Sequence, residues 1–170
     1  MTPEYAFVAV GSNRDPLNNI PRAFDLLRQT QQGVASSTFY QTEPIGPPGQ
    51  PAFMNGVWLI QTTTPPLELQ DQLHQIEAQL GRVRTTDKYA PRVIDLDLIL
   101  YGQEQYHTQA LALPHPDVSR PFVLNPILEL IACLHLEGFH EHLPKSPAVP
   151  REFGQPLPEL TEQLRQYCHP

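Results

Sequence analysis

Residues 93–101 constrain the fold more than any other part of the sequence. They alternate between two kinds of side chain, as in a β-strand whose successive residues point to opposite faces. One face is aliphatic and comprises Ile94, Leu96, Leu98 and Leu100. The other face carries two carboxylates, Asp95 and Asp97, among Val93, Ile99 and Tyr101. The pattern predicts a strand whose aliphatic face lies in the core.

The two aspartates predict a cation site. Their Cα atoms would lie roughly 6.5–7 Å apart in a strand, so the carboxylates repel each other unless a cation or a group of hydrogen-bond donors lies between them. A hard divalent ion such as Mg²⁺, with a polyphosphate completing its coordination, suits two carboxylates. Taken alone, Asp-x-Asp is equally compatible with a polar strand edge that pairs with nearby arginines.

A cluster of cations precedes this strand. It comprises Arg82, Arg84, Lys88 and Arg92. Thr85, Thr86 and Pro91 interrupt the cluster and are typical of a loop between a helix and a strand. Cations beside a metal-binding carboxylate pair are suited to a triphosphate. The alternative is a salt-bridge network on a solvated face, which would add little stability and would not require so many arginines.

Length and composition predict one globular domain over residues 1–170. Of these residues, 40% are hydrophobic and 17% are charged, which suits a single core. The 20 prolines predict extended or tightly turned connections, including a proline-rich C-terminal segment from about residue 134. A net charge of −7 argues against nucleic acid as the main partner.

Other classes of protein are excluded by what the sequence lacks. No apolar run is long enough to cross a bilayer and residues 1–4 lack the basic start of a signal peptide, so we expect a cytoplasmic protein without a membrane partner. Cys133 and Cys168 are too few for a disulfide framework or a zinc site, and we expect both to be reduced. The run His140-Glu141-His142 could bind a metal, but an exposed polar turn is the favoured interpretation.

The remaining patterns predict the order of the elements. Strands are expected at residues 5–10, 34–40 and 53–62, and short helices at residues 126–133 and around Leu160 and Leu164, with Tyr167 on the same face as these two leucines. Two longer helices follow Asp15-Pro16 and Thr64-Pro65. Their buried stripes are expected to comprise Leu17, Ile20, Phe24 and Leu27, and Leu69, Leu73, Ile76 and Leu80. Strand, helix, strand, strand, helix, strand is the order of a ferredoxin-like α+β sandwich with a mostly antiparallel sheet (βαββαβ).

Several segments could carry function or be ordinary structure. Residues 42–51 contain four prolines and two glycines, which suits either a long hairpin loop or a ligand-binding loop. Glu77 borders the second helix's apolar stripe, so its carboxylate is expected to lean toward the sheet and the cationic loop, although a solvated flank is equally compatible with Glu77 and His74. Pro114 and Pro116 predict that His115 is held in a fixed place.

A series of short motifs runs through the chain in order. They are Gly11-Ser12-Asn13, Tyr40-Gln41-Thr42, Phe53-Met54-Asn55, Gly81-Arg82-Val83-Arg84, Ala90-Pro91-Arg92-Val93-Ile94-Asp95-Leu96-Asp97 and Leu113-Pro114-His115-Pro116. With this series, residues 5–130 resemble the hydroxymethyldihydropterin pyrophosphokinases of folate biosynthesis. The resemblance implies a ferredoxin-like fold and transfer of the β,γ-pyrophosphoryl group of ATP to 6-hydroxymethyl-7,8-dihydropterin, with release of AMP.

The resemblance also assigns roles on the ATP side. Asp95 and Asp97 would hold two Mg²⁺ ions, and Arg82 and Arg92 would neutralise charge on the transferring group, which makes these four the catalytic residues. The remaining residues expected to bind ATP are Arg84 and Lys88 in the loop, His115 and Arg120 at the phosphates, and Leu98 near the adenine.

On the pterin side, Phe53 and Phe122 match the family's stacking pair, and Asn55 matches the residue that hydrogen-bonds the pterin edge. The backbone of Thr42 and Ile45 would complete the recognition. Without the resemblance, Phe53 and Phe122 would be interpreted as core aromatic residues.

His74, Glu77 and Tyr89 are expected to have supporting roles. The chain departs from the family at two of these positions and at Lys88. Tyr89 stands where tryptophan is frequent, Lys88 where arginine is frequent and His74 where glutamine is frequent. Lysine lacks the bidentate fork of arginine, so a weaker grip on phosphate is expected. Two other functions stay open: a metal-dependent phosphohydrolase that uses Asp95 and Asp97 to activate water, and a module that binds a nucleotide or pterin without turnover. Neighbouring folate-pathway enzymes are a further candidate partner for the tail.

Overall fold

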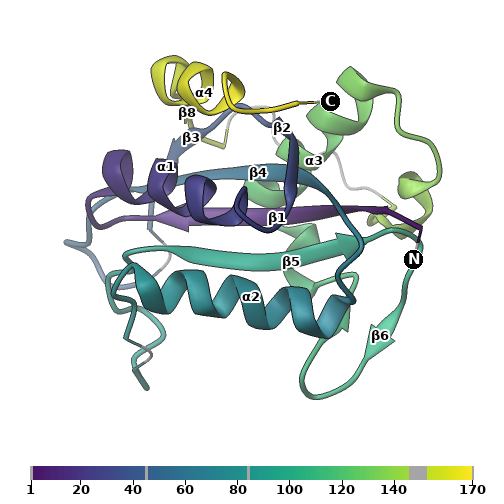
Figure 1. Cartoon of the computed structure of the whole chain (residues 1–170). Helices are drawn as coiled ribbons and strands as arrows, with labels where there is room; N and C mark the ends of the chain where they lie inside the picture. The colour runs from purple at the N-terminus through teal and green to yellow at the C-terminus, as the bar shows by residue number, and fades with distance from the viewer. Residues whose placement is uncertain (1, 45, 84, 146–152, 170) are drawn as a thin grey trace.

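The computed structural model describes residues 2–44, 46–83, 85–145 and 153–169 (Figure 1). Its helices are α1 (Pro16–Leu27), α2 (Pro66–Gln79), α3 (Pro121–Leu134) and α4 (Pro158–Arg165), with the 3₁₀ helices η1 (Pro116–Ser119) and η2 (Phe139–His142). Its strands are β1 (Glu4–Ser12), β2 (Gln32–Ser36), β3 (Tyr40–Thr42), β4 (Phe53–Thr62), β5 (Asp95–Tyr101), β6 (Tyr106–His107), β7 (Ala112–Leu113) and β8 (Gln155–Pro156). In the described part of the chain, no helix has the length and apolar character needed to span a bilayer.

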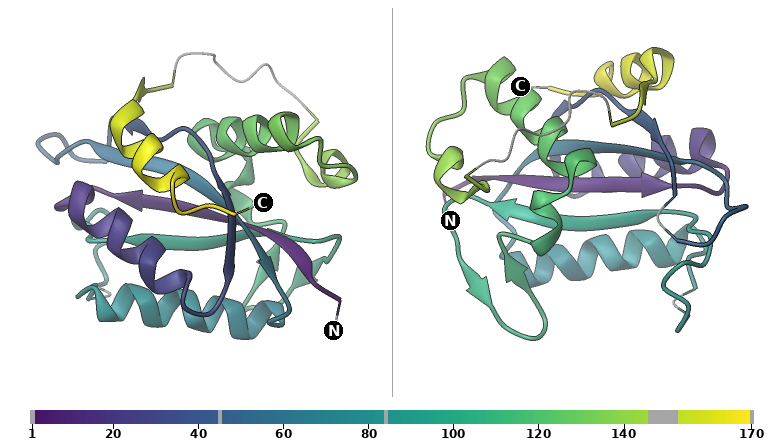
Figure 2. Two further views of the ribbon diagram at one scale, coloured as in Figure 1. Left: turned by 45° about the horizontal axis from the view of Figure 1, so that its top comes forward. Right: turned by 180° about the vertical axis from the view of Figure 1, so that it is seen from behind.

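The main sheet has the order β5-β1-β4-β3-β8, and β2 also pairs with β4. All of these pairs are antiparallel. Helices α1, α2 and α4 lie on one face of the sheet, and α3 lies on the other (Figure 2). The first and last strands of the βαββαβ unit therefore lie side by side, which confirms the predicted ferredoxin-like α+β fold.

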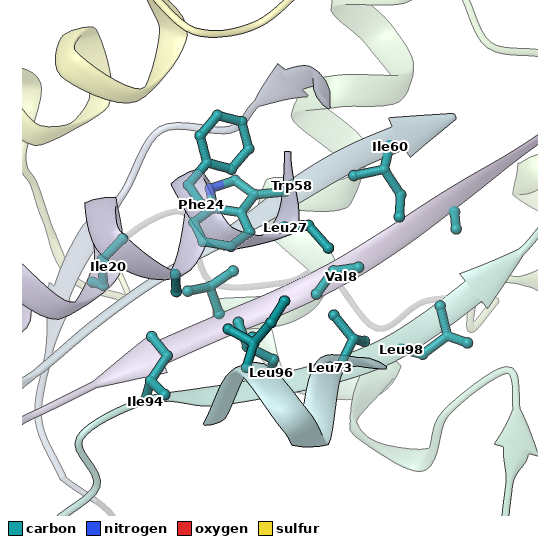
Figure 3. Packing of buried hydrophobic residues seen from close by; sticks show 14 of the residues in the cluster. Val8, Ile20, Phe24, Leu27, Trp58, Ile60, Leu73, Ile94, Leu96 and Leu98 are labelled. Atoms are coloured by element: carbon teal, nitrogen blue, oxygen red, sulfur yellow. The ribbon is translucent and has the colours of Figure 1, made fainter. Parts of the chain in front are cut away.

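Two apolar clusters hold the layers together. The larger lies between the sheet and α1, α2 and α4, where Trp58 is fully buried with its ring centroid 4.7 Å from that of Phe24 (Figure 3). The smaller lies between the sheet and α3 and includes Val57 and Leu59 of β4. Because β4 is covered on both faces, its alternation separates residues of the two clusters rather than core from solvent.

Strand β5 departs from the predicted alternation. It begins at Asp95 rather than at Val93, and Ile99 has no Cα partner in β1 because Phe7 pairs with Leu100 while Val8 pairs with Leu98. This β-bulge shifts the following residues by one position, so Leu100 faces the α3 side and Tyr101 faces the α2 side. The predicted faces of Leu100 and Tyr101 are therefore wrong.

The predicted strand at 34–40 is two strands. β2 and β3 are separated at residues 37–39, where two backbone amides bond side chains instead of a neighbouring strand. The amide of Thr38 donates to Glu129 Oε1 at 2.9 Å, and the amide of Phe39 donates to Thr161 Oγ1 at 2.9 Å.

The helices also differ in detail from the sequence prediction. Asp15 does not cap α1 with its side chain because its backbone is left-handed (φ 46°). Leu17 is 60% exposed because buried Asn19 takes the inner position, where its side chain donates to the carbonyl of Arg14. α2 begins at Pro66. α3 begins at Pro121, five residues before the predicted Pro126. Tyr167 lies beyond the end of α4 and is partly exposed, with the guanidinium of Arg28 over its ring.

Candidate active site

A cavity of about 310 Å³ opens where the ends of β1, β4 and β5 meet the loop before β5 and the start of α3. Most of the side chains predicted to bind ligands line it. They are Thr42, Phe53, Asn55, Lys88, Tyr89, Arg92, Asp95, Asp97, Arg120 and Phe122. The other lining residues include Ala9, Val10 and Gly11 of β1 and Gly56 of β4, together with Glu43, Gln50, Ala90, Asp117 and Val123.

The two aspartates of β5 face this cavity. They lie opposite Gly11 and Ala9 of β1, whose small side chains leave space in front of the carboxylates. Burial, followed by the negative charges of Asp95 and Asp117, raises the pKa of Asp97 from 3.8 to about 7, against the opposing effect of Arg82 and Arg92. The chain alone therefore supplies too little positive charge to keep Asp97 fully ionised, which is typical of a carboxylate that binds a cation.

The two arginines predicted to be catalytic both donate to Asp95. Arg82 Nη1 lies 2.6 Å from Oδ1, and Arg92 Nη1 lies 2.6 Å from Oδ2, so each carboxylate oxygen has its own guanidinium. The Arg82 side chain is only 14% exposed and does not line the cavity, whereas that of Arg92 is 33% exposed and does. Arg92 is thus the more accessible of the two cations.

Glu77 points toward the sheet, as predicted. It is 2% exposed, accepts a hydrogen bond from Arg82 and also accepts from the amide of Leu96 at 3.3 Å. The carboxylates of Glu77 and Asp95 therefore hold the Arg82 guanidinium between α2 and β5. The contacts of Arg82 with Glu77 and Asp95 therefore fix the start of β5. Asp97 lies two residues after Asp95, so the same contacts position both acids.

Ser12 and Asn13 hold the other end of the cationic segment. The hydroxyl of Ser12 donates to the carbonyl of Val93 at 2.6 Å, and the side-chain oxygen of Asn13 accepts from the amide of Arg92 at 2.7 Å. The sequence interpretation treated these two residues only as a turn and a motif. The signal that could have identified this role is the position of two polar residues at the end of an apolar strand, where buried polar groups need hydrogen-bond partners.

The segment after β7 brings three polar side chains together. The ring of His115 accepts at Nδ1 from the amide of Asp117 (3.0 Å), and Asp117 accepts at Oδ1 from Arg120 Nε (2.8 Å). Ligand atoms of Asp97, His115 and Asp117 lie within 4.8 Å of one another. Burial lowers the pKa of His115, which favours the neutral ring. Asp117 was missed from the sequence, although it directly follows the His-Pro motif.

The part of the cavity formed by β3, β4 and the start of α3 suits a flat polar molecule. Phe53 and Phe122 are half-buried and both line the cavity. Asn55 is 8% exposed and donates from Nδ2 to Thr42 Oγ1 at 2.6 Å. A Cβ atom at Gly11 would lie 2.7 Å from Asn55 Oδ1, so glycine is required there to leave the carboxamide in place.

The loop at one side of the cavity is held by Tyr89. Its carbonyl accepts from the side chain of Gln50, and Lys88 Nζ lies 4.9 Å from its ring centroid. Tyr89 thus joins the cationic loop to the end of the proline-rich loop. Gln50 was not singled out from the sequence, and its position in a loop of prolines and glycines gave no distinctive signal.

The structure does not bring every predicted residue to the cavity. Leu98 is 1% exposed and lies in the core on the α1 and α2 side, so the predicted contact with adenine is not supported. This burial follows from the strand alternation, which turns the Leu98 side chain away from that of Asp97. His74 lies on α2 and does not line the cavity. His115 stands beside the cavity through its contact with Asp117. Ile45 and Arg84 lie outside the described residues.

The sequence matches a known family over most of its length. The family model, described as 7,8-dihydro-6-hydroxymethylpterin-pyrophosphokinase (HPPK), covers residues 7–132. The chain is 38% identical over 135 residues to the 2-amino-4-hydroxy-6-hydroxymethyldihydropteridine pyrophosphokinase of Haemophilus influenzae, covering 77% of this chain and 84% of that protein. It is 39% identical over 158 residues to the protein of the same name from Pseudomonas aeruginosa, covering 89% and 96%.

The fold is shared with solved structures of larger proteins. A Plasmodium falciparum HPPK-DHPS triple mutant aligns with a TM-score of 0.58 at 12% identity, over 75% of this chain and 40% of that chain. A structure described as HPPK-DHPS in complex with substrates aligns with a TM-score of 0.57 at 13% identity, over 76% and 40%. The chain thus spans about 40% of the length of these solved proteins. At this identity the likeness concerns the fold alone.

Proposed function

The chain belongs to the 7,8-dihydro-6-hydroxymethylpterin-pyrophosphokinase family, and we propose that it transfers the pyrophosphoryl group of ATP to 6-hydroxymethyl-7,8-dihydropterin in folate biosynthesis. The hydroxymethyl oxygen forms a bond to the β-phosphorus of ATP, and the bond from that phosphorus to the oxygen shared with the α-phosphate breaks. AMP leaves with that oxygen, and the hydroxyl proton is released.

One observation carries this proposal: a single cavity brings together two chemically different groups of side chains. One group is Asp95, Asp97 and Arg92, and the other is Phe53 and Asn55. A triphosphate requires the first group and a flat heterocycle with polar edges requires the second. A hydrolase would need only the first group.

The donor set fits a hard divalent cation. Asp95 and Asp97 offer carboxylate oxygens at the cavity, and His115 and Asp117 offer further ligand atoms within 4.8 Å of Asp97. Asp95 and Asp97 would hold two Mg²⁺ ions. When bound, Mg²⁺ would neutralise negative charge on the phosphates and polarise them.

The chain's own cations act on the same phosphates. Arg92 lines the cavity and lies beside Asp95, so it is placed to stabilise charge that develops on the transferring group. Arg82 pairs with Asp95 outside the cavity lining and adds positive charge near the phosphates. Lys88 and Arg120 line the cavity and add further positive charge. Phosphoryl chemistry needs positioning and charge stabilisation, and these residues supply both without a covalent intermediate.

The aromatic and amide side chains of the cavity orient the acceptor. Phe53 and Phe122 offer aromatic faces, and Asn55 offers a donor and an acceptor to the pterin edge. The bond from Asn55 to Thr42 fixes the orientation of the carboxamide before the ligand arrives. Such preorganisation lowers the entropic cost of binding.

Product analysis tests the proposal. The protein is mixed with ATP, Mg²⁺ and 6-hydroxymethyl-7,8-dihydropterin, and the products are followed by ³¹P NMR. AMP formed only in the presence of the pterin is the expected result, and Asp97→Ala should abolish it while the fold is retained. ADP, or loss of ATP without pterin, would indicate a hydrolase instead, and binding without turnover would indicate a binding module.

We extend the proposal to a protein partner. The chain is 35% identical over 131 residues to the "Folate synthesis bifunctional protein" of Arabidopsis thaliana, of which it covers 27%. A second folate-synthesis enzyme close to this one would receive the pyrophosphorylated pterin directly. Crosslinking followed by mass spectrometry of cell extracts should recover such an enzyme, and its absence among the crosslinked proteins would count against this extension.

A further inference from the structure

The C-terminal segment 153–165 lies beyond the part of the chain that the family model matches, which ends at residue 132. It nevertheless completes the sheet and the core. β8 pairs with β3 as an edge strand, and Leu160 and Leu164 of α4 are at most 3% exposed within the larger apolar cluster. Figure 2 shows α4 packed beside β2 and β3. The segment is therefore an integral layer of the protein.

This segment satisfies the backbone of Phe39, the residue before β3. The amide of Phe39 donates to Thr161 Oγ1 at 2.9 Å, and its carbonyl accepts from the amide of Leu157 at 2.8 Å. Thr161 is 4% exposed, and its hydroxyl donates in turn to the carbonyl of Leu157 at 2.8 Å. The backbone amide of Phe39 thus bonds α4, and its carbonyl bonds Leu157, the residue just before α4.

A second set of bonds links α4 to α3. Arg165 donates to Glu129 Oε1 at 3.0 Å, and the same oxygen accepts from the amide and the hydroxyl of Thr38, each at 2.9 Å. Because α3 carries Phe122 and Thr38 lies just before β3, which carries Thr42, these bonds couple two elements that line the cavity.

The contacts continue from Phe39 to the cavity. A Cβ atom at Gly56, which lines the cavity, would lie 2.5 Å from the Phe39 ring. A Cβ atom at Gly154 would lie 2.6 Å from the carbonyl oxygen of Gln41 and 3.0 Å from Cγ2 of Thr42. The segment 153–165 therefore touches β3 on the residues that adjoin Thr42, whose hydroxyl holds Asn55.

We propose that the segment 153–165 is a positioning element that sets Thr42 and Asn55 for recognition of the pterin edge. It reaches β3 through close packing at Gly154 and through the hydrogen bonds of Thr161. The inference rests on the proposed function, because it names what recognises the pterin. It predicts a selective effect, since none of the residues of this segment lines the cavity near Asp95, Asp97 or Arg92.

Two variants with matched controls test the inference. Gly154→Ala forces Gly154 and the backbone of Gln41 apart, whereas Gln155→Ala changes the exposed side chain of the next residue. Thr161→Val removes the hydroxyl that accepts from Phe39, whereas Thr161→Ser keeps it. Each variant is assayed for binding of 6-hydroxymethyl-7,8-dihydropterin in the presence of Mg²⁺ and α,β-methylene-ATP, and for binding of that analogue alone.

For Gly154→Ala and Thr161→Val we expect the pterin Kd to rise about tenfold, with the nucleotide Kd within about twofold and both controls unchanged. The side-chain amide NMR signals of Asn55 should shift in the same two variants, a readout that needs no ligand. A merely structural role would lower the melting temperature and leave both Kd values of the folded protein and the Asn55 signals unchanged.

The outcomes separate the two proposals. If the unaltered protein binds pterin and turns over, but the two variants match their controls in pterin Kd, the positioning role is overturned and the proposed function stands. If both ligands weaken equally in the variants, the positioning role is again overturned. If the unaltered protein does not bind the pterin at all, the proposed function and this inference both fail.

Discussion

Replacing Asp97 with asparagine should stabilise the metal-free protein while removing its activity. Asparagine has nearly the same shape as protonated aspartate, so the packing around the site is retained. What the substitution removes is a negative charge that burial, Asp95 and Asp117 all disfavour. The site would then exchange function for stability, as expected of a binding site that is complete only with its ligand.

The magnitude follows from the shift in the pKa of Asp97 from 3.8 to about 7. Each unit corresponds to ~1.4 kcal/mol, and because Asp95 shares the interaction we expect about 2–4 kcal/mol at pH 8. Since the folded-state pKa is raised, the native protein loses stability as the pH rises from about 4 to about 7 and then levels off. The asparagine side chain cannot ionise, so the difference between the variant Asp97→Asn and the unaltered protein should vanish near pH 4 and reach its full value above pH 7.

Urea unfolding at pH 5 and pH 8 measures this difference. Trp58, the single tryptophan, is fully buried and reports unfolding by fluorescence. Mg²⁺ at millimolar concentration should raise the stability of the unaltered protein at pH 8 and leave Asp97→Asn unchanged. The reasoning would be refuted if the variant were no more stable at pH 8, or if its advantage were the same at both pH values.

Three further substitutions test separate parts of the site. Phe122→Ala should raise the KM for the pterin about tenfold or more through loss of stacking, with the KM for ATP nearly unchanged in steady-state kinetics; equal changes in both would contradict a stacking role. Glu77→Ala should lower the free energy of unfolding by about 2–3 kcal/mol because Arg82 loses a buried charged partner, and a loss of less than about 1 kcal/mol in urea unfolding would argue against this. Asp117→Ala should raise the KM for ATP up to about fivefold by freeing Arg120, whereas an unchanged KM would show that the pair does not position that cation.

Much of the fold follows from local patterns in the sequence. β4 was predicted with its observed limits because ten residues of strand formers lie between a proline-rich loop and a Thr-Pro helix start. The inward orientation of Glu77 was predicted because its spacing from Leu73 and Leu80 fixes its place on the helix. Where one element decides its own conformation, one stretch of sequence is enough.

The features that were not predicted depend on distant residues. The break at residues 37–39 is stabilised by Glu129 and by Thr161, which lies 122 residues from Phe39 along the chain. The bulge at Ile99 could not be seen because aliphatic residues occupy both faces of β5 there, so the pattern gave no indication of a shift. That residues 1–170 form one domain stays a prediction, although the packing of β8 and α4 on the same sheet supports it.

The bulge at Ile99 divides β5 into two parts with different mutational freedom. Before it, the face with Asp95 and Asp97 opens to the cavity, but Asp95 is also the partner of Arg82, so a change of charge is free of the core only at Asp97. After it, apolar residues are buried on both faces, and only swaps that conserve volume should be tolerated. The carbonyl of Ile99 accepts from the amide of His115 at 2.9 Å, so the junction itself is also occupied. Redesign of the metal site therefore has to keep Asp95 as the partner of Arg82, whereas repacking beyond the bulge involves only apolar contacts.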